Sequence, residues 1–243
     1  MSYQRWGRLG KVAHVLGVPE WRRALRMHGV AAGTEHLQML QALGPVQTII
    51  DVGANRGQFA LAARRAWPQA TIVSFEPLSG PAEIYRGVFA ADGRTRLVEA
   101  ALGAAPEQAT IHVSGRDDSS SLLPITTMQS ALFPGTGEVA AQQVRVTRLA
   151  DELDHIESPA LLKLDVQGFE LQALRGCEDL LDRLDWIYVE CSFVELYAGQ
   201  ALADEVIAWL RERGFALHGV HNMAYDRSGQ AIQADFLFAR SVR

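Results

Sequence analysis

The segment Asp51-Val-Gly-Ala-Asn-Arg-Gly57 places an acid and two glycines at the end of a short apolar run. Residues 48–50 have the composition of a buried strand, and the apolar spacing after Gly57 is typical of a helix. A strand that turns on glycines into a helix brings backbone N–H groups close to a ligand. The spacing differs from the Gly-x-Gly-x-x-Gly pattern that holds a pyrophosphate. We therefore expect a nucleoside-type ligand here, and the alternative is a tight strand-to-helix corner without a ligand.

Acidic residues stand at the ends of four predicted strands, and these residues are Asp51, Glu76, Asp165 and Glu190. In a doubly wound sheet, ligands bind beyond the carboxyl ends of the strands, so the four side chains are expected to converge on one crevice. Glu76 follows Gly53 by about 20 residues, the distance at which an acid accepts hydrogen bonds from the ribose hydroxyls of a nucleotide. Asp51 has an alternative role, which is to orient the turn without touching the ligand.

A lysine lies inside the apolar strand that ends at Asp165. Lys163 stands between Leu162 and Leu164, and a buried lysine needs a carboxylate partner. The sequence offers Glu170 and Glu190 as candidates for this ion pair.

Short apolar runs alternate with helical patterns from Thr48 onward, which predicts an α/β fold with a doubly wound, mostly parallel sheet. The predicted strands are 47–51, 71–75, 95–99, 109–113, 143–147, 160–165, 185–190, 215–220 and 234–239. The predicted helices are 34–43, 57–67, 80–91, 147–154, 168–183 and 201–213. Turn-forming residues separate the last two strands, which predicts an antiparallel hairpin at the edge of the sheet. We divide the chain into a helical N-terminal extension, 1–44, and a main domain, 45–243.

Six motifs in this order resemble the FkbM-type S-adenosylmethionine-dependent methyltransferases. They are Asp51-Val-Gly-Ala-Asn-Arg-Gly57, Phe75-Glu76-Pro77, Ala101-Leu102-Gly103, Ser120-Ser121-Leu122, Lys163-Leu-Asp165-Val-Gln-Gly168-Phe-Glu170 and Asp235-Phe236-Leu237-Phe238. The resemblance covers roughly residues 46–240, and the motif that begins at Lys163 is its most specific part. The chain departs from the family at Gln167, where glutamate is usual, so we assign Gln167 no catalytic role.

The resemblance implies a class I methyltransferase (Rossmann-like) fold with seven strands and transfer of a methyl group to an oxygen. In that family, members act on hydroxyls of sugars, polyketide macrolides and related metabolites. By resemblance, Gly53 and Gly57 would let the backbone approach the methionine moiety of S-adenosylmethionine, and Asn55 would contact its methionine end. Glu76 would hold the ribose, and the segment 99–102, with Ala101, would line the adenine.

An alcohol is almost wholly protonated at neutral pH, so methyl transfer to it is helped by a base or a metal. Two arrangements fit the sequence. In one, His221 or Asp165 accepts the proton. In the other, Asp165 and Glu190 hold a divalent cation such as Mg²⁺ that also binds a vicinal diol. We therefore name Asp165, Glu190 and His221 as catalytic candidates, and Asp165 and Glu190 as metal ligands.

The polar stretch 114–142 is expected to be an irregular loop, and a loop of this length inside a domain is usually functional or disordered. Its residues Ser119, Ser120 and Ser121 could hydrogen-bond an acceptor sugar, and the alternative is a plain surface loop. The leading hypothesis is thus an O-methyltransferase acting on a glycoside, glycolipid or polysaccharide precursor. The alternatives are an O-methyltransferase of a polyketide or macrolide, a nicotinamide-dependent dehydrogenase, and a non-catalytic binding module.

Composition adds constraints on partners and compartment. The net charge is −5 at pH 7, which gives no indication of nucleic-acid binding, and the chain has only two cysteines and no long apolar run. We expect a cytoplasmic enzyme without a transmembrane segment or a signal peptide. Residues 1–30 are basic, with six Lys/Arg residues against Glu20. This segment is expected to pack on the main domain as a helix, and the alternatives are contact with an anionic membrane surface or with a partner subunit.

Overall fold

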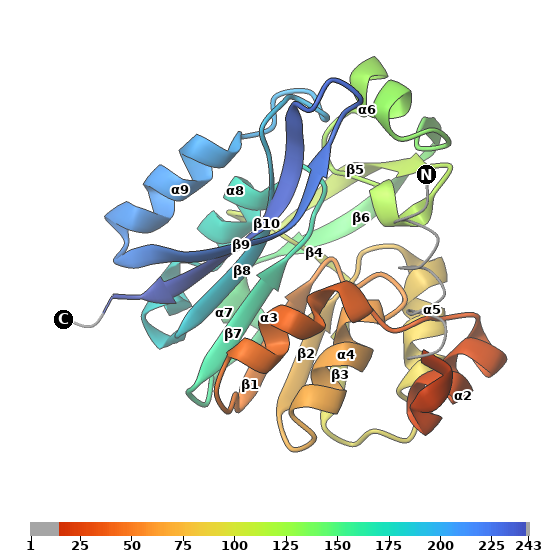
Figure 1. Ribbon diagram of the computed structural model, residues 1–243, viewed down its shortest axis with the longest axis vertical. Coiled ribbons are helices and arrows are strands. Elements are labelled where there is room, and N and C mark those ends of the chain that lie inside the picture. The colour runs from red at the N-terminus through yellow and green to blue at the C-terminus, as the bar shows by residue number, and fades with distance from the viewer. Residues whose placement is uncertain (1–14, 242–243) are drawn as a thin grey trace.

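A seven-stranded sheet runs through the molecule, of which the computed structural model describes residues 15–241 (Figure 1). The strand order is β3 (Thr95–Val98), β2 (Thr71–Phe75), β1 (Thr48–Val52), β7 (Ala160–Leu164), β8 (Trp186–Ser192), β10 (Ala231–Arg240) and β9 (Phe215–Tyr225). The first five pair in parallel, whereas β10 is antiparallel to both β8 and β9. The prediction of a mostly parallel sheet that ends in an antiparallel hairpin is confirmed.

Two of the predicted strands, 109–113 and 143–147, belong to a second, three-stranded sheet. Its order is β4 (Ala101–Leu102), β6 (Glu138–Thr147) and β5 (Glu107–Ser114). The prediction of an irregular loop over 114–142 is wrong in part, since this stretch contains η2 (Asp117–Ser119), α6 (Thr127–Leu132) and the first half of β6. Residues 138–143 are exposed, so this part of the strand owes its conformation to pairing with β5 and not to an apolar pattern.

Helices cover both faces of the large sheet, because side chains alternate between the faces along each strand. Ile49 packs with the N-terminal helices, and the next residue, Ile50, packs with the C-terminal ones. The first group comprises α2 (Pro19–His28), η1 (Thr34–His36), α3 (Leu37–Ala42), α4 (Gln58–Ala66) and α5 (Ser79–Val88). The second comprises α7 (Leu149–Glu152), α8 (Glu170–Gly176), η3 (Glu178–Arg183) and α9 (Ala203–Glu212).

The described part of the N-terminal extension packs into the same core as the sheet. Trp21 on α2 is 1% exposed, and its indole N–H donates to the carbonyl of Leu61 on α4 at 3.1 Å. The basic residues Arg5, Arg8 and Lys11 lie outside the described residues, as does the first part of the helix expected within residues 1–30. Within residues 15–241, no helix is both long and apolar enough to cross a membrane.

Candidate active site

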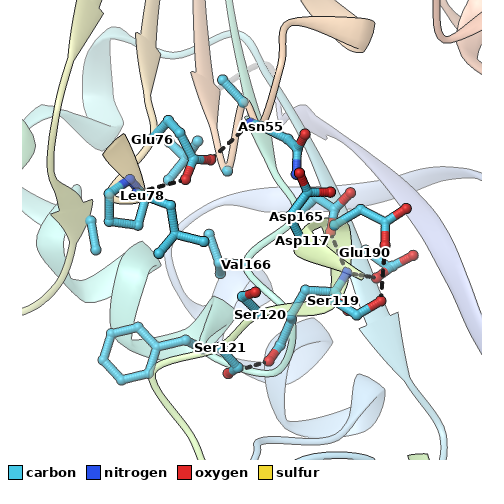
Figure 2. Close-up of a pocket in the computed structure, with 18 of the residues that line it drawn as sticks. Asn55, Glu76, Leu78, Asp117, Ser119, Ser120, Ser121, Asp165, Val166 and Glu190 are labelled. Atoms are coloured by element: carbon cyan, nitrogen blue, oxygen red, sulfur yellow. Dashed lines mark hydrogen bonds between the residues drawn. The ribbon is translucent and has the colours of Figure 1, made fainter. Parts of the chain in front are cut away.

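A cavity of about 360 Å³ opens at the carboxyl ends of β1, β2, β7 and β8, and residues of η1, η2 and α6 also line it. Of the residues predicted from the sequence, it is lined by Gly53, Asn55, Glu76, Ala101, Ser119, Ser120, Ser121, Asp165 and Glu190. Figure 2 shows Glu76 and Asn55 on one side of this space and Asp165 and Glu190 on another. Three predicted residues are not part of the lining, namely Asp51, Gly57 and His221.

The glycine turn after β1 is shaped by its protein neighbours. Gly53 has φ 75°, and a Cβ there would lie 1.9 Å from the carbonyl oxygen of Asp165. Gly57 has φ 94°, and its Cβ would lie 2.6 Å from the ring of Phe89. The close packing of Gly57 against Tyr85 on α5 and against Phe89 explains why this position is a glycine. The expectation that Gly57 approaches the ligand is therefore not supported.

The backbone N–H groups of this turn already have acceptors inside the chain. Those of Gly53 and Ala54 donate to the carbonyl of Phe75, and that of Gly57 donates to the carbonyl of Ala54. The N–H of Asn55 donates to the Glu76 carboxylate. The turn therefore contributes space and shape to the cavity, and not the free N–H donors that the strand–glycine–helix pattern suggested.

Glu76 is fixed at the end of β2 by two backbone donors. Its Oε2 accepts the N–H of Asn55 and its Oε1 accepts the N–H of Leu78, each at 2.8 Å (Figure 2). The residue is 5% exposed, and this burial raises the pKa of Glu76 to about 7. Each carboxylate oxygen has a second lone pair, so the ionised group can still accept two hydroxyl donors from a ligand in the cavity.

Asp51 and Lys163 form a buried ion pair beneath the cavity. They are register partners on β1 and β7, with Lys163 Nζ 3.3 Å from Asp51 Oδ1. The same ammonium donates to the Gly53 carbonyl at 3.1 Å and lies 3.8 Å from Asp165 Oδ2. Burial lowers the pKa of Lys163, but the carboxylates of Asp51 and Asp165 outweigh this effect and hold the pKa above its usual value. Asp51 therefore acts through Lys163 on the turn and does not line the cavity.

The prediction that Glu170 or Glu190 pairs with Lys163 is wrong. Glu170 is 4% exposed, and its Oε1 accepts the N–H groups of Gly168 and Val166 at 3.0 and 3.3 Å. It therefore closes the turn between β7 and α8. Glu190 on β8 belongs to a different group of side chains.

Gln167 bridges the two carboxylates that the sequence singled out for catalysis. Its Nε2 donates to Asp165 Oδ1 at 2.7 Å and to Glu190 Oε2 at 3.1 Å, while its Oε1 accepts the Tyr197 hydroxyl at 2.6 Å. Glu190 Oε1 accepts a further amide N–H, from Gln233 at 2.8 Å. Burial and the neighbouring Asp165 raise the pKa of Glu190 well above its usual range.

This bridge does not suit the divalent cation expected at Asp165 and Glu190. An amide nitrogen donates hydrogen bonds and carries no lone pair for a metal, and here it occupies the position between the two carboxylates. Within residues 15–241, no group of three or more His, Cys, Asp or Glu side chains is arranged to hold a metal ion. The expectation of Mg²⁺ at this site is therefore not supported by the donor set.

The three serines predicted to bind an acceptor are engaged within the chain. Ser121 donates to the carbonyl of Gln167 at 2.6 Å, and the hydroxyl of Ser120 accepts the N–H of Ser114 at 3.1 Å. The hydroxyl of Ser119 donates to Asp118 Oδ1 at 3.1 Å, and its backbone carbonyl accepts the Tyr197 hydroxyl at 3.1 Å. These hydrogen bonds hold the segment around η2 against the cavity, so a structural role explains the serines.

The histidine that lines the cavity is not the one predicted. The ring of His221 on β9 packs edge-on against Tyr188, with centroids 6.1 Å apart, outside the cavity lining. His36 on η1 does line the cavity, and its Nδ1 lies 3.1 Å from the Tyr188 hydroxyl. Sequence reasoning missed His36 because it precedes the first strand, in the segment assigned to an extension, and belongs to no recognisable motif.

Comparison with known protein families identifies the family to which a chain with this site belongs. The model of the FkbM methyltransferase domain matches residues 51–217, which is more than half of the chain. The chain belongs to the FkbM methyltransferase family. The strand order of its large sheet is accordingly that of a class I methyltransferase, and the chain is an S-adenosylmethionine-dependent methyltransferase.

Curated relatives of this FkbM-family chain are distant in sequence. Methyltransferase 1 of Beauveria bassiana (strain ARSEF 2860) is 28% identical over 186 residues, covering 70% of this chain and 72% of the relative. The 31-O-demethyl-FK506 methyltransferase FkbM of Streptomyces tacrolimicus is 28% identical, covering 72% and 75%. The 2-O-methyltransferase NoeI of Sinorhizobium fredii (strain NBRC 101917 / NGR234) is 29% identical, covering 68% and 72%.

The cavity of this FkbM-family member fits S-adenosylmethionine in its chemistry. Glu76 offers acceptors for ribose hydroxyls, and the neighbouring side chains of Leu78, Leu102 and Ile111 give an apolar wall for an adenine ring. Asp165 and Asn55 supply polar atoms on other parts of the lining. The lining therefore combines an apolar part with polar parts, and this composition matches the chemistry of the methyl donor.

Proposed function

We propose that this methyltransferase transfers the methyl group to a hydroxyl oxygen of a sugar, in a glycoside, a glycolipid or a polysaccharide precursor. The observation that carries the proposal is the cluster of hydrogen-bonding side chains beside Asp165, which comprises Gln167, Glu190 and Gln233. Carboxylate and amide groups recognise the hydroxyls of a polyol. Two relatives carry names that specify transfer to oxygen, which supports the same class of reaction.

The proposal assigns each part of the cavity a role. Glu76 binds the ribose, the apolar wall of Leu78, Leu102 and Ile111, with Ala101 next to Leu102, binds the adenine, and Asn55 lies at the methionine end. The bound cofactor supplies an electrophilic methyl group on a sulfonium centre. The protein then has to align the acceptor oxygen behind the methyl carbon, and alignment of this kind lowers a barrier by about 7–11 kcal/mol. Asp165 is proposed to face the methyl group and the acceptor.

A polyketide or macrolide hydroxyl is the second candidate acceptor, because one relative is named for its action on 31-O-demethyl-FK506. The family membership sets aside a dehydrogenase and a non-catalytic module.

We propose the cytoplasm as the compartment, since Cys177 and Cys191 are both free and buried. A glycolipid acceptor would bring the enzyme to the cytoplasmic face of a membrane, near which the basic segment 1–30 would contact anionic lipids.

The function is tested by transfer of tritium from [methyl-³H]S-adenosylmethionine to three kinds of probe. These are methyl glycosides, a glycolipid in anionic vesicles, and a hydroxylated macrolactone. Label should move to the glycosides or the glycolipid, and alkali-stable product would show an ether and not an ester. Transfer to the macrolactone alone would establish the second candidate. Failure of the protein to bind S-adenosylhomocysteine in calorimetry would contradict the assignment of the cavity.

Cofactor affinity is expected to rise with pH because of Glu76. Burial raises the pKa of Glu76 to about 7. The protonated carboxyl therefore contributes its full share to the stability of the ligand-free fold at pH values below its unfolded pKa. This contribution to stability is lost as the pH rises through 7. Ribose hydroxyls donate to the ionised form. The affinity for S-adenosylhomocysteine, measured by calorimetry, should therefore increase about tenfold from pH 6 to pH 8.

The Glu76→Gln variant should bind S-adenosylhomocysteine more weakly and with a flat pH profile over the same range. Glu178→Gln serves as the matched control, since Glu178 is exposed and pairs with Arg213 outside the cavity, and it should keep the rise. An unchanged slope in Glu76→Gln would show that another group governs the pH dependence.

Metal independence is a second expected result. The amide of Gln167 satisfies Asp165 and Glu190 at 2.7 and 3.1 Å, so calorimetry with Mg²⁺ or Mn²⁺ should show no binding and EDTA should leave methyl transfer unchanged. The Gln167→Glu variant replaces the donor with a third carboxylate and is expected to gain cation binding. If EDTA abolished methyl transfer and added Mg²⁺ recovered it, the result would support a metal ion at Asp165 and Glu190.

A further inference from the structure

Three polar side chains form a hydrogen-bonded network behind His36, on the face of the sheet that the N-terminal helices cover. The Tyr188 hydroxyl donates to Asp235 Oδ2 at 2.7 Å, and Asn222 Nδ2 donates to the same oxygen at 2.7 Å. His36 Nδ1 lies 3.1 Å from the Tyr188 hydroxyl oxygen and 3.7 Å from Asp235 Oδ2. The network joins η1, β8, β9 and β10, and it ends at a residue that lines the cavity.

The network fixes the tautomer of the imidazole. Because the Tyr188 proton goes to Asp235, the Tyr188 oxygen is left as an acceptor, and the proton between it and His36 must sit on Nδ1. In the neutral ring, Nε2 then carries the lone pair. Neither Phe59 nor Tyr188, whose rings meet His36 edge-on at centroid distances of 5.3 and 5.6 Å, provides a donor to that nitrogen.

Electrostatics keep the ring neutral and yet able to accept a proton. Burial lowers the pKa of His36, and the negative charge of Asp235 opposes this effect. The other charged groups that act on the ring are Lys163, Glu35 and Asp165. A buried histidine with an acid behind its far nitrogen is suited to take a proton, because the acid stabilises the imidazolium as it forms.

The alternatives from the sequence are less suited to this task. His221 lies outside the cavity lining. Glu190 already accepts amide N–H groups from Gln167 and Gln233. Asp165 accepts from Gln167 and lies 3.8 Å from the Lys163 ammonium, so its oxygens are placed to bind hydroxyls and to hold the acceptor.

We propose that His36 is the general base of the methyl transfer, with Tyr188 and Asp235 as positioning residues. The inference rests on the proposed function, because it requires a hydroxyl acceptor. The acceptor oxygen forms its bond to the methyl carbon as the bond from this carbon to sulfur breaks. The electron pair of the broken bond stays on sulfur, which loses its positive charge, and the hydroxyl proton passes to Nε2 of His36. The histidine later returns this proton to solvent.

The first test compares variants in methyl transfer to whichever probe acceptor the unaltered enzyme uses. His36→Gln should lower kcat by about 10²–10⁴-fold, with the affinity for S-adenosylhomocysteine retained as proof of folding. His155→Gln is the matched control, because His155 is exposed on a loop, and it should keep full activity. Turnover of His36→Gln within a few-fold of the unaltered enzyme would overturn the proposal.

The second test needs no acceptor and therefore separates this inference from the proposed function. In ¹⁵N-histidine NMR at pH 7, His36 should carry its proton on Nδ1 and a bare Nε2. Tyr188→Phe should disturb this tautomer and lower kcat less than His36→Gln does. A proton on Nε2, or a charged ring at pH 7, would refute the base. If no probe is methylated while S-adenosylhomocysteine binds, the choice of acceptor has failed, and the NMR result alone decides the role of His36.

Discussion

Replacing Lys163 by methionine is expected to lower the free energy of unfolding by about 3–5 kcal/mol, the usual cost of removing one partner of a buried ion pair. Asp51 is 0% exposed, and both of its carboxylate oxygens have no hydrogen-bond partner among the described residues. The Lys163 ammonium at 3.3 Å is therefore its counter-charge. Methionine would leave the Asp51 carboxylate uncompensated, and it would also remove the donor to the Gly53 carbonyl.

Urea unfolding measures this loss, and its pH dependence identifies the cause. Burial raises the pKa of Asp51 in the unaltered protein, and the charge of Lys163 opposes this effect. Without Lys163, the pKa of Asp51 would rise further. The variant should therefore be relatively stable at low pH and lose stability as the pH rises through that pKa. Adding Asp51→Leu to Lys163→Met should recover most of the loss. Arg86→Met, which breaks the exposed Arg86–Glu99 pair, should cost at most about 1 kcal/mol. Equal losses in both ion pairs would contradict the argument.

Substituting alanine for Gly53 is the second change with a large expected effect. The new Cβ would lie 1.9 Å from the Asp165 carbonyl oxygen, and φ is 75°. The left-handed conformation costs about 1–3 kcal/mol for a residue other than glycine, and overpacking adds about 1–3 kcal/mol. Because the obstacle is backbone, the turn after β1 and the turn after β7 must separate. Both turns line the cavity, so cofactor binding should weaken together with stability.

Thermal unfolding and calorimetry with S-adenosylhomocysteine measure the two effects of Gly53→Ala. Gly80→Ala is the matched control, since a Cβ at Gly80 meets nothing within 4 Å and Gly80 lies on α5. That change should be neutral or slightly stabilising, because alanine favours a helix more than glycine does. A variant at Gly53 that melts and binds like the unaltered protein would show that the two turns can move apart freely.

The mostly parallel sheet could be predicted because its central strands have strong local signals. The apolar runs at 48–52 and 160–164 are buried at every position, and the motifs that follow them are specific to the family. The partner of Lys163 could not be predicted, because it depends on register. Asp51 and Lys163 face each other only once β1 and β7 are aligned, and no local pattern states that alignment.

The parts of the site that escaped prediction lack a periodic pattern of their own. His36 lies on a three-residue helix, and its role depends on Tyr188 and Asp235 from strands that follow much later. Gln167 stood out as a departure from the family, but only the structure shows that its amide bridges Asp165 and Glu190. An amide at this position donates a hydrogen bond to each of two acids, whereas the sequence suggested that a metal ion joins them.

The insertion of β10 between β8 and β9 has a consequence for the order in which the protein can mature. Asp235 belongs to this strand, the last of the described chain, while His36 belongs to a segment that leaves the ribosome early. The two meet through Tyr188 only after β10 has paired with both neighbours. The imidazole is therefore oriented only when the last strand of the sheet is in place. In a chain truncated before β10, the cavity would keep the residues of its Glu76 end, while His36 would lack the acid that we propose behind it.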